Sequence, residues 1–162
     1  MGDCFPDVCD CTCNQPYNEF ESIISKEISF PFSFDELCHS NIGWFTDEKI
    51  CNDHHLNDWI DASCYGIYLL WHKDDYCATH NMFHMKGLYV GKGNIKNRII
   101  SHFKKKDFSN EMIVYFTFIE MINRRAKFLE QLLLDHFNFP FNKNENNGKK
   151  KLCSYFSQIE VD

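Results

Sequence analysis

The sequence of 162 residues has no run of about 18 consecutive apolar residues, the length that a membrane-spanning helix needs. Its first residues are acidic and carry cysteines, so they lack the basic start and apolar stretch of a secretory signal peptide. Position 6 is Pro6 instead of serine or threonine, so Gly2 does not begin a myristoylation signal. We therefore expect no membrane span, no signal peptide and no lipid anchor at the start.

A paired cysteine framework is also missing, because the nine cysteines are odd in number and irregularly spaced. This excludes a small secreted disulfide scaffold and predicts reduced, buried thiols in an intracellular reducing compartment, cytoplasm or nucleus; a secreted effector stays open. Four cysteines lie near the start: Cys4, Cys9, Cys11 and Cys13. The last three could hold a soft metal, but their spacing is not the usual zinc spacing.

The chain can form one compact domain, because 44% of its residues are hydrophobic and sixteen are phenylalanine. Charge divides it. Residues 1–60 hold twelve acidic and two basic residues, a net of −10, whereas residues 61–162 hold fifteen basic and eleven acidic, a net of +4. The sum is the net charge of −6. A basic region behind an acidic one indicates a polyanionic partner for the basic part.

The acidic part, residues 1–60, is predicted to be a cysteine-containing extension packed on a domain formed by residues 61–162. Apolar residues at helical spacing predict a helix over residues 17–30, and residues 33–63 hold enough apolar side chains for two short helices. The extension carries no readable motif. Its charge is expected to be solvated, to weaken nucleic-acid binding, or to receive a protein partner or inhibitor.

Two short apolar segments, each with one tyrosine, precede a basic helical pattern and predict two strands that lead into a helix. Side chains alternate along a strand, so Tyr68 shares a face with Gly66, and Tyr89 shares one with Gly91. Glycine on the same face is expected to leave the phenols uncovered and to let a ligand come close. Two ordinary strand tyrosines beside turn glycines are the alternative.

The two segments contain the motifs Gly66-Ile67-Tyr68 and Tyr89-Val90-Gly91-Lys92-Gly93. Together they resemble the GIY-YIG nuclease family, with valine in place of the second isoleucine, and the longer motif resembles a branch that includes nucleases linked to ankyrin repeats and LEM domains. The resemblance covers about the last hundred residues. It implies an α/β domain with a small, mainly antiparallel three-stranded sheet flanked by helices, and a metal-dependent endonuclease acting on DNA.

A helix is predicted from a cap at Asn94 to about Lys106, with its basic end at Lys104, Lys105 and Lys106. Arg98 and His102 are four residues apart and therefore project from one face. A guanidinium can hold two oxygens of one phosphate, and an imidazole beside it can move a proton. The resemblance places an arginine and a histidine at this spacing in this helix; a surface Arg and His are the alternative.

A third strand is predicted over residues 113–120, and a helix from Asn123 to about Phe137. Glu130 falls inside the apolar stripe of that helix, where a carboxylate needs a cation. The partner could be Arg98 or one Mg²⁺ or Mn²⁺ ion held with waters and phosphate. The resemblance implies that Glu130 is the metal ligand.

The resemblance also implies roles for the remaining site residues. Tyr68 would be the general base, with cations expected to favour its phenolate, and His102 a second candidate base or proton shuttle. The other implied residues are Tyr89 and Asn142 in catalysis, Lys92 in both catalysis and binding, and Gly91, Gly93 and the three lysines in nucleic-acid binding. A catalytically inactive nucleic-acid-binding or protein-interaction module with the same fold is the alternative function.

The segment between the tyrosine strands, residues 72–86, is predicted to be a loop. It contains Cys77, His80 and His84 at intervals that could close around a structural zinc ion. Intervals of this kind arise by chance in a chain with eight histidines, so the plain loop is the favoured interpretation.

Overall fold

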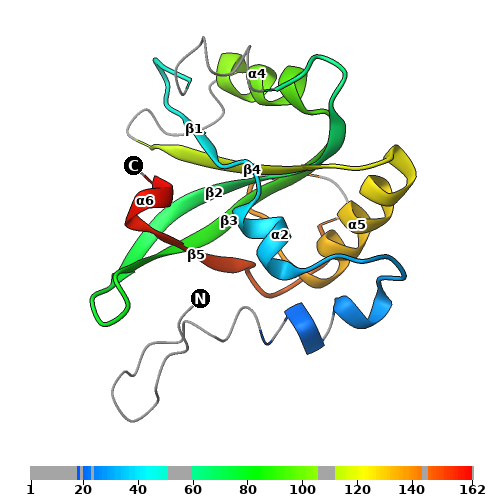
Figure 1. The fold of residues 1–162 in the computed structure, drawn as a ribbon, viewed down its shortest axis with the longest axis horizontal. Helices are drawn as coiled ribbons and strands as arrows, with labels where there is room; N and C mark the ends of the chain where they lie inside the picture. Colours follow the sequence, from blue (N-terminus) through cyan, green and yellow to red (C-terminus); the bar gives the residue numbers. More distant parts are fainter. Residues whose placement is uncertain are drawn as a thin grey trace.

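The computed structural model describes residues 18, 20–22, 24–50, 60–105, 112–143 and 146–161. Within them the chain forms an α/β fold around one open, five-stranded antiparallel sheet with strand order β1-β4-β2-β3-β5 (Figure 1). The strands are β1 (Gly43–Phe45), β2 (Tyr65–Cys77), β3 (Met82–Asn94), β4 (Val114–Glu120) and β5 (Cys153–Ser157). The helices are the 3₁₀ turn η1 (Ser25–Glu27), α2 (Phe34–His39), α4 (Ile95–Lys105), α5 (Asn123–His136) and α6 (Gln158–Val161).

The sheet has five strands where the sequence predicted three. The predicted strands form its centre as β4, β2 and β3, and β1 and β5 extend it at the two edges. β1 has only three residues and pairs with β4 about seventy positions later in the chain, for example Gly43 with Phe116. No local pattern marks so short a strand, because its pairing partner and not its own sequence defines it.

The prediction of a loop over residues 72–86 is wrong, because most of this segment forms strands. β2 and β3 continue through it as one long hairpin, which turns at residues 78–81 with Asn81 at φ 53°. Tyr76 pairs with Phe83 across the hairpin, and their ring centroids lie 4.8 Å apart. Cross-strand aromatic pairs of this kind stabilise a hairpin, so the strands persist beyond the part that β4 covers.

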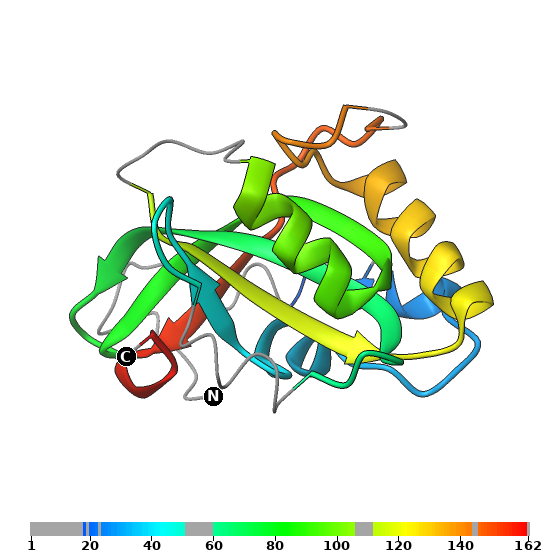
Figure 2. The same ribbon diagram turned by 90° about the horizontal axis from the view of Figure 1, so that it is seen from above.

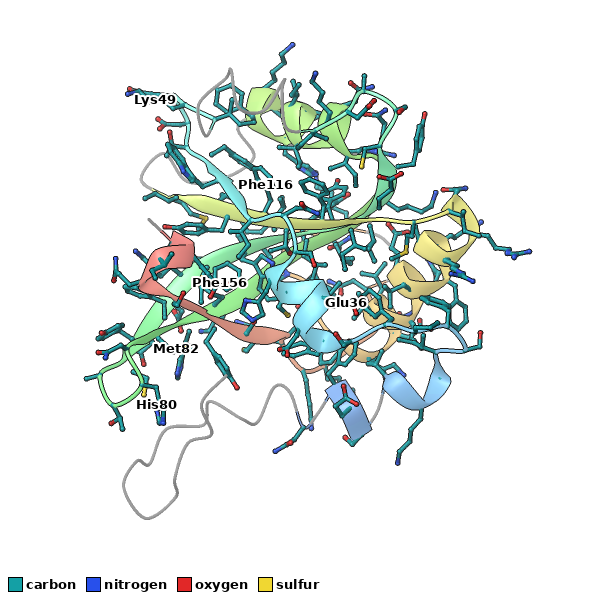
Figure 3. All side chains as sticks on the ribbon, in the orientation of Figure 1. Glu36, Lys49, His80, Met82, Phe116 and Phe156 are labelled. Carbon is teal, nitrogen blue, oxygen red and sulfur yellow. The ribbon has the colours of Figure 1, made fainter. Side chains whose placement is uncertain are left out.

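The two faces of the sheet are covered by different helices. Ile67, Leu69 and Trp71 of β2 belong to a buried cluster shared with α2 and α5, whereas Tyr68 and Leu70 belong to a second cluster shared with α4. This alternation is the period of two expected for a strand buried on both faces. Figure 1 shows α4 on one side of the strands and α2 and α5 on the other. Phe116 and Phe156, labelled in Figure 3, lie in these opposite layers.

The described part of the extension joins the same core. Phe20, Ile24 and Phe34 are buried in the cluster that contains Trp71 and the apolar residues of α5. The helix predicted over residues 17–30 is shorter than expected: residues 18 and 20–22 are helical, a 3₁₀ turn follows, and residues 28–33 are not helical. Of the two short helices predicted over residues 33–63, α2 is present, and residues 51–59 lie outside the described part.

The predicted helices of the second part are confirmed. Asn94 caps α4, because its side-chain oxygen accepts a hydrogen bond of 3.0 Å from the amide of Asn97. α5 spans the predicted residues and buries Ala126, Leu129 and Leu133. In the part of the chain that the structure describes, no helix is long and apolar enough to cross a membrane.

Candidate active site

The two motif tyrosines lie side by side at one end of the central hairpin. Tyr68 of β2 pairs with Gly91 of β3, and Leu70 pairs with Tyr89, so the tyrosines are diagonal neighbours on one face. Their ring centroids are 5.9 Å apart and their planes differ by 29°. Figures 1 and 2 show the hairpin turn at one end of the molecule and α5 beside the other end.

Gly91 makes room for the Tyr68 ring, and not for a ligand. A β-carbon at Gly91 would lie 2.6 Å from both Cζ and the hydroxyl oxygen of Tyr68. Tyr68 is fully buried (0% exposed), and Tyr89 is half-buried. The expectation that glycines leave the phenols uncovered is therefore wrong for Tyr68, because its own ring fills the space that the missing side chain creates.

α4 brings the predicted histidine and arginine to these tyrosines. Nε2 of His102 is 2.8 Å from the Tyr68 hydroxyl oxygen, within hydrogen-bond distance, and its ring packs edge-on against Tyr89 at 4.6 Å. Arg98 is exposed, and its Nε would lie 3.2 Å from a β-carbon at Gly93, which has φ +126°. Gly93 thus provides both a left-handed turn into α4 and space for the guanidinium stem.

The environment of Tyr68 holds the proton on its phenol. Burial raises the pKa of Tyr68 well above its ordinary value, the charge interaction with Tyr89 raises it further, and Arg98 lowers it by less. The sequence predicted that nearby cations favour the phenolate. Desolvation outweighs Arg98 here, and Lys92 lies on the opposite face of β3, because it pairs with Ile67. The protein's own groups therefore keep Tyr68 in its neutral, hydrogen-bonding form.

Glu130 completes the group of predicted residues from the other side. It is half-buried on α5, next to buried Leu129 and Leu133, and its negative charge acts on Tyr68 by raising the pKa of the phenol. Glu130 and Arg98 therefore lie within electrostatic range of one phenol, although they come from helices on opposite faces of the sheet.

The donor chemistry of Glu130 fits a hard divalent ion. Mg²⁺ commonly binds one or two carboxylates and completes its shell with water and substrate phosphate. Among the described residues no three His, Cys, Asp or Glu side chains gather into a metal-binding group, so any ion at Glu130 would depend on such outer ligands. The described residues of the hairpin likewise hold no three-ligand zinc group: Cys77 Sγ is 3.4 Å from Nδ1 of His80, while the ring of His84 packs against Tyr155. His80 and Met82 mark the hairpin tip in Figure 3.

The side chain of Asn142 forms hydrogen bonds with the backbone of β3. Its side-chain oxygen accepts from the amide of Val90 at 2.9 Å, and its side-chain nitrogen donates to the carbonyl of Val90 at 3.0 Å. Phe141 adds a backbone hydrogen bond to Leu88. One side-chain amide thus forms the two hydrogen bonds that a neighbouring strand would form, and it fixes the strand that carries Tyr89.

The predicted lysines are divided between two places. Lys104 and Lys105 are exposed in the last turn of α4, and Lys106 lies outside the described residues. Lys92 donates a hydrogen bond of 3.1 Å to the side-chain oxygen of Asn123, the first residue of α5. Asn123 was not predicted as a site residue; its position at the start of the helix that carries Glu130 was the available signal.

Comparison of the chain with protein-family models, with curated proteins and with solved structures finds no match. The resemblance to the GIY-YIG nucleases therefore rests on the motif residues of the sequence alone.

Proposed function

We propose that the chain is a divalent-metal-dependent endonuclease that hydrolyses phosphodiester bonds in DNA. The observation that carries the proposal is the convergence of residues from four elements: Tyr68 from β2, Tyr89 from β3, His102 and Arg98 from α4, and Glu130 from α5. These residues are 62 positions apart at the extremes, and they are the residues that the motif resemblance names.

Arg98 and Glu130 supply the charges that phosphate chemistry needs. The exposed guanidinium of Arg98 can donate two hydrogen bonds to the non-bridging oxygens of the scissile phosphate and stabilise the charge that grows there. Glu130 would hold the divalent ion, which when bound stabilises the leaving oxygen as a Lewis acid. Arg98 and the ion at Glu130 would thus act on different oxygens of the same phosphodiester, from opposite sides of the site.

His102 is the group that takes the proton from water in this proposal. His102 is half-buried and reaches solvent, whereas Tyr68 is enclosed and keeps its proton. One water proton passes to the imidazole, the water oxygen bonds to phosphorus, and the bond to the leaving oxygen breaks, with that oxygen protonated by solvent. In this step Nε2–H of His102 would donate to the Tyr68 hydroxyl oxygen, which leaves the lone pair of Nδ1 to take the water proton. Tyr89 packs on the imidazole ring and orients the phosphate or the water.

The test is cleavage of plasmid and branched DNA by wild type and Glu130→Gln, with Mg²⁺, Mn²⁺ or EDTA. Glutamine has nearly the same shape but no charge for a divalent ion, so we expect Glu130→Gln to fold and to lose cleavage by a factor on the order of 10² or more. Asp135→Asn removes an exposed carboxylate from the same helix and is the matched control. Metal-dependent nicking by purified Glu130→Gln at the wild-type rate would remove the metal assignment.

The burial of Tyr68 also favours a second candidate, a nucleic-acid-binding or protein-interaction module without catalysis. In that case the Tyr68–His102 hydrogen bond has a packing role. The same experiment separates the two functions, because a binding module would show no nicking with any metal.

A further inference from the structure

The face of α5 that carries Glu130 also carries two polar residues one and two turns earlier. In a helix, residues separated by three, four and seven positions lie on one face, so Asn123, Lys127 and Glu130 form one stripe. The rise of 1.5 Å per residue places Lys127 about 4.5 Å, and Asn123 about 10.5 Å, along the axis from Glu130. Lys127 and Asn123 are exposed, and Glu130 is half-buried, so the stripe follows the rim of the packed face.

β3 adds a second cation to this stripe. Lys92 points to the α5 side of the sheet, as its pairing with Ile67 requires, and its Nζ is held 3.1 Å from the side-chain oxygen of Asn123. A lysine bound through a neutral amide keeps its full charge and has further N–H groups to donate. Lys127 and Lys92 therefore form a positive track that begins at Glu130.

The start of α5 has no compensating negative charge in its own sequence. Its first turn contains no acidic residue, and the residues that follow Asn123 are Arg124, Arg125 and, after Ala126, Lys127. Cations are unfavourable near a helix N-terminus. The guanidinium of Arg125 makes a cation–π contact with Phe30, with its carbon 4.9 Å from the ring centroid. Lys127 is exposed, one turn before Glu130 on the same helix face.

We propose that Lys127, together with Lys92 positioned by Asn123, binds the phosphate next to the scissile one in a bound nucleic acid strand. This deepens the proposed nuclease function and rests on it. Phosphate binding needs point charges at intervals along the strand, and lysine supplies a charge without fixing sequence. The track sets how the strand leaves the site, and it is separate from the basic end of α4 at Lys104 and Lys105.

The salt dependence of DNA binding tests this directly. A fluorescent duplex is titrated with the full chain in EDTA at several salt concentrations between about 50 and 200 mM, where each phosphate contact contributes about 0.9 to the slope of log K against log salt. Lys127→Gln should reduce the slope by about 0.9. Asn123→Ala should weaken binding less, because Lys92 keeps its charge and loses only its anchor. Lys49→Gln, an exposed lysine after β1 and labelled in Figure 3, is the control and should keep the wild-type slope.

The outcomes separate the track from the nuclease function. If wild type binds and cleaves DNA but Lys127→Gln keeps the wild-type slope, the track is refuted and the nuclease function stands. If Lys127→Gln keeps the wild-type slope but unfolds at a lower denaturant concentration, the track is also refuted, and Lys127 is a helix-stabilising partner of Glu130. If wild type neither binds nor cleaves DNA, both proposals fail.

Discussion

Gly91→Ala is the substitution whose effect the geometry of the site defines most sharply. The new β-carbon would lie 2.6 Å from Cζ and the hydroxyl oxygen of Tyr68, whereas an ordinary contact begins near 3.4 Å. The ring must therefore move by about 0.8 Å, the difference between these two distances. Gly91 does not have a positive φ, so the backbone accepts alanine and the collision alone sets the cost.

The collision should lower both stability and activity. Tyr68 is fully enclosed, so moving its ring overpacks the core, which costs about 1–3 kcal/mol of unfolding free energy. A shift of about 0.8 Å also displaces the hydroxyl from its 2.8 Å hydrogen bond to His102. Misplacement of about 1 Å in a catalytic group costs on the order of 10²-fold in rate, and we expect a loss of that order in nicking.

The assay combines denaturant unfolding with plasmid nicking in Mg²⁺. Gly87→Ala is the control, because its β-carbon would meet Phe139 at 3.1 Å and the carbonyl of Leu152 at 3.2 Å, away from the tyrosines. It should lose stability with little loss of nicking per folded molecule. In a Tyr68→Phe background, Gly91→Ala should cause little further loss of nicking, because both substitutions act on nicking through the Tyr68 hydroxyl. Wild-type nicking and stability in Gly91→Ala would refute the packing argument.

Two further predictions concern the base and the strand clamp. Because burial raises the pKa of Tyr68, a phenolate base would make the nicking rate climb through about pH 9. With His102 as the base we expect no such climb, and observing one would return the base role to the Tyr68 phenolate. Asn142→Ala should lower the unfolding free energy by about 1–3 kcal/mol, because it leaves the amide and carbonyl of Val90 without their partner. Unchanged hydrogen exchange at Val90 in that variant would contradict the clamp.

The elements that local pattern specifies could be predicted from the sequence, and those that tertiary pairing specifies could not. α4, α5 and the three central strands each carry their own periodicity and, in α4, a cap at Asn94. β1 has three residues and is defined as a strand by its pairing with β4. The far half of the hairpin reads as polar loop because Lys73, Asp74 and Asp75 interrupt the apolar pattern, although cross-strand contacts hold it as strand.

The same division applies to the site. The motif resemblance named Tyr68, Arg98, His102 and Glu130 as site residues, and the fold brings them within electrostatic or hydrogen-bonding range of Tyr68. The enclosure of Tyr68 was not predictable, since it depends on α4 packing against the face of β2 that carries Tyr68. The link from Asn142 to Val90 spans 52 positions and has no local signal either. Sequence therefore indicated which groups meet, and packing decided which of them reaches water.

The far half of the β2–β3 hairpin has a consequence for how copies of the chain meet in solution. β4 pairs with β2 only as far as His72, so residues 73–77 of β2 form an open sheet edge within the described part of the chain. The register shifts between Lys73 and Asp75, which bulges Asp74 out of the ladder, where it forms a 3.0 Å ion pair with Lys86. A bulge and charged side chains prevent a second strand from adding to such an edge. The polar interruption that resembles a loop thus protects the hairpin against edge-to-edge aggregation.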